Sequence, residues 1–472
     1  MERLFTRTLV FVGALVASLA LGATAASAAT RFAASAGSGA SCIQADPCSI
    51  ATAVNGGPGD EVILLPGNYS ISATLNVLNP TSIHGLDGAP RPTITSTSAF
   101  SAIEVTAANA VIRHVEIEAP GDGVTGSGVA LEAGGQMLED VVVDATSNGC
   151  SPASTSGTIT IRNSICRGDA VGVGVACVGC NETVVLRNVT AIGGTNGVAF
   201  NSSFGSPSTY TVNAFNTIAR HTGGSGADVA AIAHTTNSST VINLDHSNYA
   251  TRSEVHDCTT APCTATVTDP STNSNQTTAP MFVFELGGDF HQAPDSPTVN
   301  AGINDGSNGS ADIDGQDRTI DTTTDIGADE LGLPTTTALA CFPTALTLPG
   351  MSTCTATETD STASPVAPTG PVAFESDASG TFSSSTCTLA PSGPTGQASC
   401  AVTYTPDLAG THGLTAVSGQ DTTHEGSKGA TSLSATAPAT PTPVPPAVKK
   451  KKCKKKHKRA AAAKKKCKKH KK

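Results

Sequence analysis

Three charged residues fall at the same position of successive repeats along the chain. A short phrase, Ile112-Arg113-His114-Val115 in its first copy, recurs along the chain. Glu118, Asp144 and Arg167 each lie six residues after the start of one copy, and Ile192 and Arg220 hold the same position in the next two copies. We call this set of equivalent positions a column. Strands of neighbouring coils lie ~4.8 Å apart, so these side chains would line up on one outer face. Two carboxylates about 5 Å apart can act as acid and nucleophile in glycoside cleavage. Alternatively, the arginine could act as base on a uronic acid while the carboxylates hold Ca²⁺ against the substrate's charge.

The same column also fits a structural role, which we favour. A ladder of charges in which Arg167 neutralises Asp144 needs no substrate. The alignment rests on imperfect repeats, and a slip of one residue would turn every side chain to the opposite face. Catalysis by Glu118, Asp144 and Arg167 is therefore a hypothesis.

Aspartates crowd a short stretch near the end of the repeat region: Asp305, Asp312, Asp314, Asp317, Asp321 and Asp325. Of these, Asp312, Asp314 and Asp317 surround a glycine and offer hard oxygen ligands, as in part of a Ca²⁺ loop. An EF-hand is not expected, because flanking helices are missing and the terminal glutamate is misplaced. The alternative is a capping turn whose aspartates pair with Arg318.

Fourteen cysteines fall mostly in near pairs: Cys42/Cys48, Cys150/Cys166, Cys177/Cys180, Cys258/Cys263, Cys341/Cys354, Cys387/Cys400 and Cys453/Cys467. An even number at short separations in an exported chain predicts local disulfides. The alternative is a zinc site built on Cys177 and Cys180 with Cys150 or Cys166 nearby. Such a site would need a second pair in a helical or knuckle context, which the sequence lacks.

The start of the chain has the pattern of an export signal. Arg3 and Arg7 precede an apolar run at 9–21, and residues 26–28 (ASA) offer a small-residue cleavage site. We therefore expect a signal peptide over 1–28, with an uncleaved anchor helix as the alternative. No later stretch has ~18 consecutive apolar residues, so no span is expected in the mature chain.

Short β-strands are expected to carry the candidate residues. Charged residues make up only 14% of the chain, which has 47 glycines and no tryptophan, and this composition excludes a coiled coil or helical bundle. A phrase of the type Ile112-Arg113-His114-Val115 recurs with its starts separated by 26, 23, 25, 28 and 30 residues. One short strand per ~25 residues predicts a solenoid whose coils stack on one another. The predicted fold class is all-β.

The third position of the phrase is polar in every copy: His114, Asp140, Asn163, Asn188, Asn216 and His246. Short polar side chains at a fixed position are typical of turns, where they satisfy backbone groups. We therefore interpret the two histidines as turn residues rather than catalytic ones.

Residues 59–69 (GDEVILLPGNY), followed by Ile83-His84-Gly85, resemble the opening of bacterial right-handed parallel β-helix proteins of the pectin-lyase-like superfamily. Residues 289–297 (DFHQAPDSP) and 312–330, closing with DIGADE, are similar to the choice-of-anchor type end of secreted and surface β-helix proteins.

This resemblance implies a right-handed parallel β-helix over 58–331, after an N-terminal cap segment at 29–57. It says little about chemistry, because the superfamily mixes lyases, hydrolases, epimerases and non-enzymes. Its enzymes usually grip sugars with basic and aromatic side chains. This chain has no lysine before Lys428 and no tryptophan, so we expect a non-enzyme.

A second module follows. Residues 335–435 have the size and short alternating strands of an Ig-like β-sandwich. The stretch 404–424 resembles bacterial Ig-like repeats of surface proteins, and the pairs Cys341/Cys354 and Cys387/Cys400 fit that pattern. Modules of this kind usually act as spacers or adhesive units.

The chain ends in a Pro-rich linker at 436–448 and a basic tail at 449–472. Sixteen of the 28 basic residues lie in this tail, which has no acid, so the rest of the chain has 12 basic and 38 acidic residues and a net charge of −26. Mutual repulsion predicts a disordered tail. Outside a cell it would bind anionic wall polymers or a membrane surface, and nucleic acid only inside one. Alternatively, it only maintains solubility or folds back on the acidic body.

These patterns together predict an exported, cell-envelope-associated protein with a role in surface binding or display. A glycan is a candidate ligand. No cofactor is expected apart from possible Ca²⁺. The alternative is a polysaccharide lyase or glycoside hydrolase acting through the β-helix.

Overall fold

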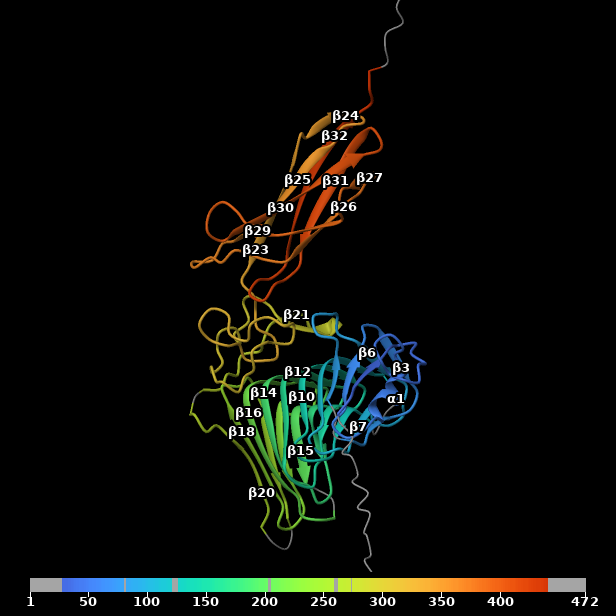
Figure 1. The fold of residues 1–472 in the computed structure, drawn as a ribbon. Helices are drawn as coiled ribbons and strands as arrows, with labels where there is room; N and C mark the ends of the chain where they lie inside the picture. Colours follow the sequence, from blue (N-terminus) through green and yellow to red (C-terminus); the bar gives the residue numbers. More distant parts are fainter. Residues whose placement is uncertain are drawn as a thin grey trace, which may run out of the picture.

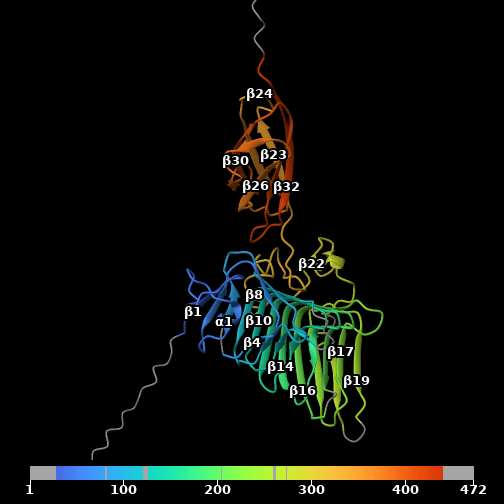
Figure 2. The ribbon, with the colours of Figure 1, turned by 90° about the vertical axis from the view of Figure 1, so that its right-hand side faces the viewer.

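A computed structural model describes residues 28–79, 82–120, 126–202, 205–258, 262–272 and 274–439. Almost all regular structure in these ranges is β, and the first half of the chain forms a β-solenoid of about eight turns (Figure 1, Figure 2). The predicted tail at 449–472 with its cysteine pair Cys453/Cys467, and most of the predicted signal peptide, lie outside these residues.

Two parallel sheets form the walls of the solenoid. In the described residues, the larger sheet, called sheet A, has twelve strands: β1 (Thr30–Ala33), β2 (Glu61–Leu64), β3 (Asn68–Ile71), β5 (Ser82–Gly85), β6 (Thr93–Ser96), β8 (Val111–Ala119), β10 (Met137–Ala145), β12 (Thr158–Gly168), β14 (Asn181–Gly193), β16 (Thr209–His221), β18 (Ser239–Asp245) and β20 (Thr264–Thr268). Neighbouring strands along this sheet are separated by one coil of sequence, so each coil hydrogen-bonds to the next.

The second wall is an eight-stranded sheet on the other side of each coil. Its strands, in chain order, are β4 (Leu75–Val77), β7 (Ile103–Val105), β9 (Ser127–Leu131), β11 (Asn148–Pro152), β13 (Val171–Ala176), β15 (Asn196–Ser202), β17 (Val229–Ala233) and β19 (Arg252–His256). Inward side chains from both sheets fill one continuous apolar core.

The predicted repeat is confirmed at the level of single residues. The structure pairs the phrase starts with one another in chain order: Ile112, Leu138, Ile161, Leu186, Ala214 and Leu244. Val115, Val141 and Val189 are fully buried, as are Ile117 and Val143, so the expected inward positions face the core. A coil cannot bury these side chains alone, and stacking therefore holds the solenoid together.

The third phrase position bends the chain in every coil, inside the strand in all copies but the last. His114, Asp140, Asn163, Asn188, Asn216 and His246 all have φ between 45° and 55°. This left-handed conformation favours Asn, Asp and His among residues with a side chain. Asn188 donates to Asn163 at 2.8 Å, and Asn216 donates to Asn188 at 2.9 Å. The expected turn is therefore a left-handed bend within the strands, and its asparagines make structural hydrogen bonds along the column.

The N-terminal segment closes the first coil. The helix α1 (Ile50–Val54) is capped by Ser49 and buries Ile50, Ala53 and Val54 against the core. Strand β1 adds to the edge of β2, so the chain covers the end of the sheet with its own strand. No described helix has the length and apolar character needed to cross a membrane.

After β20 the chain runs back over the outer face of sheet A. Residues 279–333 form this return arm, which contains β21 (Phe282–Phe284), a 3₁₀ turn at Glu285–Gly287 and β22 (Asp289–Gln292) but is otherwise irregular. The backbone carbonyl of Asn308 accepts hydrogen bonds from Asn163 at 3.0 Å and Asn188 at 2.9 Å. The predicted β-helical range of 58–331 thus holds solenoid strands up to Thr268 and the return arm after them.

The return arm carries a small apolar core of its own. Phe290, Ile313 and Ala328 pack on Ile165 and Ile192, which point outward from β12 and β14. All five residues are at most 5% exposed. The arm therefore turns an outer face of the solenoid into a second buried layer.

The C-terminal part forms two five-stranded sheets around one core. The first contains β23 (Thr335–Phe342), β25 (Ser352–Asp360), β27 (Gly380–Phe382), β29 (Ala390–Pro391) and β30 (Gln397–Pro406). The second contains β24 (Ala345–Thr347), β26 (Pro371–Ser376), β28 (Thr386–Thr388), β31 (Gly410–Ser418) and β32 (Ser427–Thr436). Leu339 and Val402 from the first sheet pack on Phe374 and Leu414 from the second.

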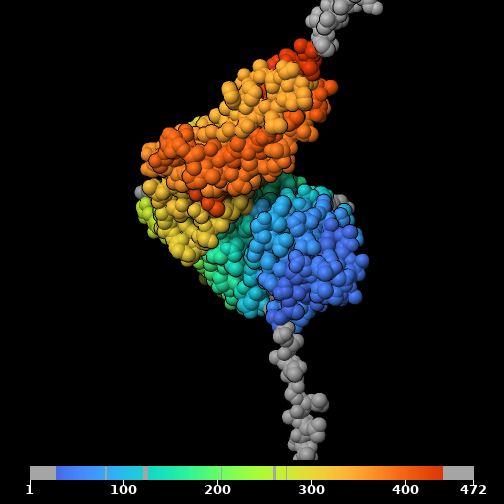
Figure 3. All heavy atoms as spheres, turned by 45° about the horizontal axis from the view of Figure 1, so that its top comes forward, coloured from blue at the N-terminus to red at the C-terminus, as the bar shows by residue number. Residues whose placement is uncertain are grey.

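This C-terminal domain stands on the return arm (Figure 3). The backbone amide of Asp317 donates to the carbonyl of Thr422 at 2.7 Å, and that of Leu333 donates to Thr423 at 2.8 Å. The Gly332 amide donates to Glu425 Oε1 at 2.9 Å. The loop between β31 and β32 therefore docks on the arm through backbone hydrogen bonds.

Six disulfides join the cysteines of the described residues: Cys42–Cys48, Cys150–Cys166, Cys177–Cys180, Cys258–Cys263, Cys341–Cys354 and Cys387–Cys400. All six agree with the sequence-based pairing. The zinc alternative at Cys177 and Cys180 loses its support, because these sulfurs and those of Cys150 and Cys166 are bonded in pairs. Disulfides in this number are typical of extracellular proteins.

Candidate functional site

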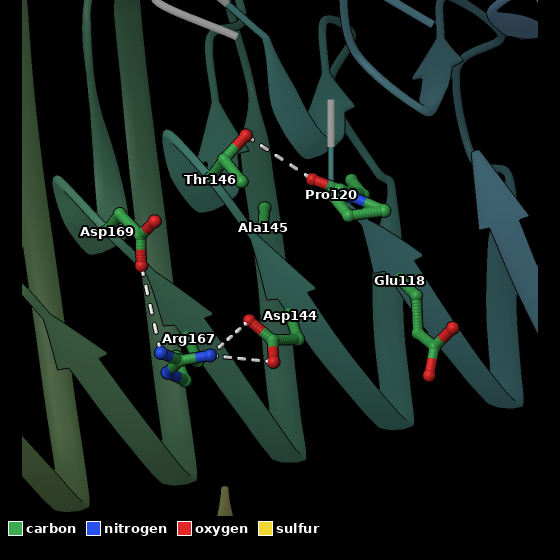
Figure 4. Close-up of a pocket in the computed structure, with 8 residues that line it drawn as sticks. Glu118, Pro120, Asp144, Ala145, Thr146, Arg167 and Asp169 are labelled. Carbon is green, nitrogen blue, oxygen red and sulfur yellow. Dashed lines mark hydrogen bonds and ion pairs between the residues drawn. The ribbon is translucent and has the colours of Figure 1, made fainter. Parts of the chain in front are cut away.

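The three predicted catalytic residues come together on the outer face of sheet A. Asp144 pairs in register with Glu118 on β8 and with Arg167 on β12. With Asp169 they line an open pocket of about 400 Å³ (Figure 4). The alignment of the repeats therefore predicted which side chains share this column and which face they occupy.

Within this pocket, Arg167 forms an ion pair with Asp144. Its Nη1 donates to both oxygens of Asp144 at 2.7 Å, and its Nη2 lies 3.7 Å from Asp169 (Figure 4). The Glu118 carboxylate accepts instead from the Thr95 hydroxyl at 3.0 Å. Asp144 and Arg167 are 48% and 38% exposed. Arg167 thus neutralises Asp144, as expected for a charge ladder, while Glu118 pairs only with a hydroxyl and water reaches the column.

The same column changes character one coil beyond Arg167. Ile192 pairs with Arg167 in register but is only 2% exposed, because the return arm covers it. Arg220 follows and donates to Thr278 at 3.0 Å and to Asp228 at 3.3 Å. Burial lowers the pKa of Arg220, and Asp228 opposes that shift. The column is therefore a site candidate only at its open end.

The predicted calcium residues lie in different surroundings. Asp312 is 1% exposed, and its carboxylate accepts the amides of Asp314 at 2.9 Å, Gln316 at 2.7 Å and Glu330 at 3.0 Å. Burial raises its pKa to about 6, against the effect of these hydrogen bonds. Asp317 is exposed. Calcium binding by Asp312, Asp314 and Asp317 stays a prediction.

The alternative is a capping turn whose aspartates pair with Arg318, and the structure gives this arginine other partners. Arg318 is fully buried and donates to Thr324 Oγ1 at 3.0 Å and to the Ala328 carbonyl at 2.8 Å. Its ion pair is with Glu330 at 3.3 Å rather than with an aspartate carboxylate. The guanidinium therefore holds the closing residues of the arm in place.

A different cluster was missed by sequence analysis. His291 Nδ1 lies 2.5 Å from Asp289 and its Nε2 lies 2.9 Å from Asp314, and the hydrogen bond with Asp314 is the largest cause that raises the pKa of His291 to about 10. Asp329 lies beside them at 4% exposure, and burial raises its pKa well above the usual range. Asp289 and His291 lie in β22, but Asp314 and Asp329 follow much later in irregular chain, so no periodicity connects the four residues.

A buried acid inside the solenoid is a further finding. Glu182 is 4% exposed, and one of its oxygens accepts the Ser154 amide at 2.6 Å. The other oxygen and the hydroxyl of Tyr210, its partner on β16, are buried without a hydrogen-bond partner in the described residues. Burial raises the pKa of Glu182 to about 7. Enclosure in the core makes it a structural residue rather than a surface site.

Comparison with known proteins gives neither a family nor a relative for this chain. No protein family model matches the chain, and no curated protein sequence matches it.

Proposed function

We propose that this chain is an exported, non-enzymatic protein of the cell envelope, whose basic tail holds an acidic body on anionic polymers. The observation that carries the proposal is the separation of charge. A net charge of −26 over the body faces 16 positive charges within 24 residues. Such a tail attracts polyanions and releases their counterions, independently of any shaped pocket.

Several features support export to an oxidising compartment. The expected signal peptide at 1–28 precedes a body with six disulfides, which form and persist outside the cytosol. The solenoid agrees with the resemblance to right-handed parallel β-helix proteins of the pectin-lyase-like superfamily. The two sheets at 335–436 suit an Ig-like spacer, which would carry the solenoid away from the attached tail.

In this proposal, the acidic body of the protein binds a partner or presents a surface to one. The Asp144 carboxylate is neutralised by Arg167 on both oxygens, which leaves neither group free to act on a sugar without breaking that pair. Long stacked strands nevertheless expose rows of side chains at fixed spacing, as repeat proteins do when they bind extended partners. A glycan is the partner class that we propose for this face.

Retention on purified anionic wall material tests the envelope role. The full chain should bind at low salt and be released at ~1 M NaCl, where the screening length falls to ~3 Å. A chain ending at Ala447 should not be retained. Deletion of Ala460–Ala463 is the matched control and should change little, because the number of charges carries the attraction. Equal retention of the truncated chain would overturn the proposal.

A polysaccharide lyase or glycoside hydrolase is the second candidate. One observation favours it: Glu118, Asp144 and Arg167 line a single pocket. If they are catalytic, the purified protein should release unsaturated or reducing ends from a uronate or neutral glycan, and Glu118→Gln should abolish that activity. Absence of release across a broad panel, at pH values from acid to neutral and with Ca²⁺ added, would exclude this candidate in favour of surface binding.

A further inference from the structure

The pocket around His291 lies where the return arm meets the C-terminal domain. It encloses about 270 Å³ and is lined by Asp289, His291, Asp314 and Asp329 from the arm, with Val283, Gln292, Gln420 and Glu425 completing it. Four of these residues are acids, one is a histidine, and none of the lining residues is a lysine or arginine. This lining favours a cation over an anion.

Three side chains in this pocket offer converging ligand atoms. One nitrogen of His291 and one carboxylate oxygen each of Asp314 and Asp329 all lie within 4.8 Å of one another. Ligands bonded at ~2.1 Å to a tetrahedral zinc ion stand about 3.4 Å apart. The His291 and Asp314 side chains are partly exposed, which leaves them room to rotate toward that spacing.

Asp329 is the most buried of these three ligands. It is only 4% exposed, and its Oδ2 accepts the Gln292 backbone amide at 2.6 Å. A carboxylate buried in this way on the wall of an acidic pocket is either protonated, as its raised pKa indicates, or ionised with a cation beside it.

The histidine is already oriented by a second carboxylate. The 2.5 Å hydrogen bond between Nδ1 and Asp289 fixes the imidazole ring and leaves Nε2 directed at Asp314. A carboxylate behind a metal-binding histidine is the usual arrangement that sets its tautomer and strengthens it as a ligand. Metal binding would replace the proton that Nε2 shares with Asp314.

We propose that His291, Asp314 and Asp329 bind a divalent first-row transition-metal ion such as Zn²⁺, with Asp289 as the positioning residue and water in the remaining position. An imidazole nitrogen with two carboxylates suits such an ion, whereas Ca²⁺ takes oxygen ligands and more of them. The site shares only Asp314 with the calcium trio expected from the sequence.

Equilibrium dialysis of the full chain against ZnCl₂ tests this site. The tail has its own histidines and cysteines, so the comparison is between variants that all keep it. His291→Ala and Asp314→Asn should each bind one Zn²⁺ fewer per chain than the unchanged protein. The control is His234→Ala, which removes a histidine paired with a single aspartate, Asp257, outside the pocket, and it should lose none.

Thermal unfolding gives a second measurement of Zn²⁺ binding, because an ion that binds only the folded chain raises its unfolding temperature. Zn²⁺ at 100 times its dissociation constant should stabilise the folded chain by about 2.7 kcal/mol, and this shift should vanish in Asp314→Asn, whose partly exposed side chain can change without unpacking a core. Equal Zn²⁺ stoichiometry in the unchanged protein and both variants would overturn the proposal. Displacement of the ion by an equal concentration of Ca²⁺ would overturn the proposed class of metal.

Discussion

The outer face of sheet A is open to water at one end and covered at the other. Asp144 and Arg167 lie in the open part and are 48% and 38% exposed, whereas Ile192, in the same column, is 2% exposed beneath the return arm. Exposed ion pairs add little stability because water competes for both partners. Covering an apolar side chain removes it from water and adds more. The arm, rather than the strands, therefore decides which part of the face is structural and which can meet a ligand.

Phe290→Ala should give the largest effect on this comparison. Phe290 is 3% exposed and packs on Ile165 and Ile192, so its truncation should lower the free energy of unfolding by about 3–5 kcal/mol. Phe100→Ala makes the same change at a side chain that is 70% exposed and should cost ~0.5 kcal/mol or less. Urea unfolding of both variants measures the difference. Similar losses in the two would mean that the arm does not pack on the sheet.

Glu182→Gln tests how a carboxyl buried inside the solenoid affects the free energy of unfolding, in comparison with carboxyls on its outer face. Burial raises the pKa of Glu182 from the ordinary 4.5 of a glutamate to about 7 in the folded protein. The folded state therefore holds an extra proton between these values, and stability falls as pH rises through this window. Removing the acid should stabilise the protein by roughly 3 kcal/mol at pH ~8. The gain should disappear below pH ~4.5, where both states are protonated.

Chemical unfolding of Glu182→Gln at several pH values measures this effect. Glu118→Gln, whose side chain is exposed on the outer face, is the matched control. A gain for Glu182→Gln that did not change with pH would show that the effect comes from packing and not from ionisation.

The Asp144–Arg167 pair should give the smallest effect. A double-mutant cycle with Asp144→Asn and Arg167→Gln should return a coupling free energy of at most ~1 kcal/mol, because both groups are partly solvated. The coupling should shrink further at ~1 M NaCl. A coupling of several kcal/mol that resists salt would place this pair in a drier environment than its exposure indicates, and would strengthen the case for chemistry in the pocket.

The repeats predicted the solenoid because each coil carries its own copy of the pattern. Leu138 and Leu186 start phrases that pair in register with Ile161, and the same spacing placed Glu118 beside Asp144. Disulfides were equally local: the six bonds join cysteines 3–16 residues apart. Patterns that repeat or close over a few residues can be read from one sequence.

The return arm could not be predicted in this way. Its contacts join residues far apart in the chain, as where Asn308 lies 145 residues from Asn163. Its backbone is irregular, so hydrophobic periodicity gave no sign that Phe290 would cover Ile192. The cluster of His291 with Asp329 depends on this same path. Residues 289–297 were noted only for their resemblance to a family end, which did not indicate a ligand site.

The attachment of an acidic body by a basic tail is the central claim, and the salt dependence of affinity tests it most directly. The measurement is the dissociation constant for a defined anionic polymer, for the full chain and for a chain ending at Ala447, between ~0.1 M and ~1 M NaCl. We predict that log affinity of the full chain falls steeply and linearly with log salt, and that the truncated chain binds too weakly to measure throughout. Equal affinities for the two chains, or an affinity of the full chain that salt does not change, would contradict the account.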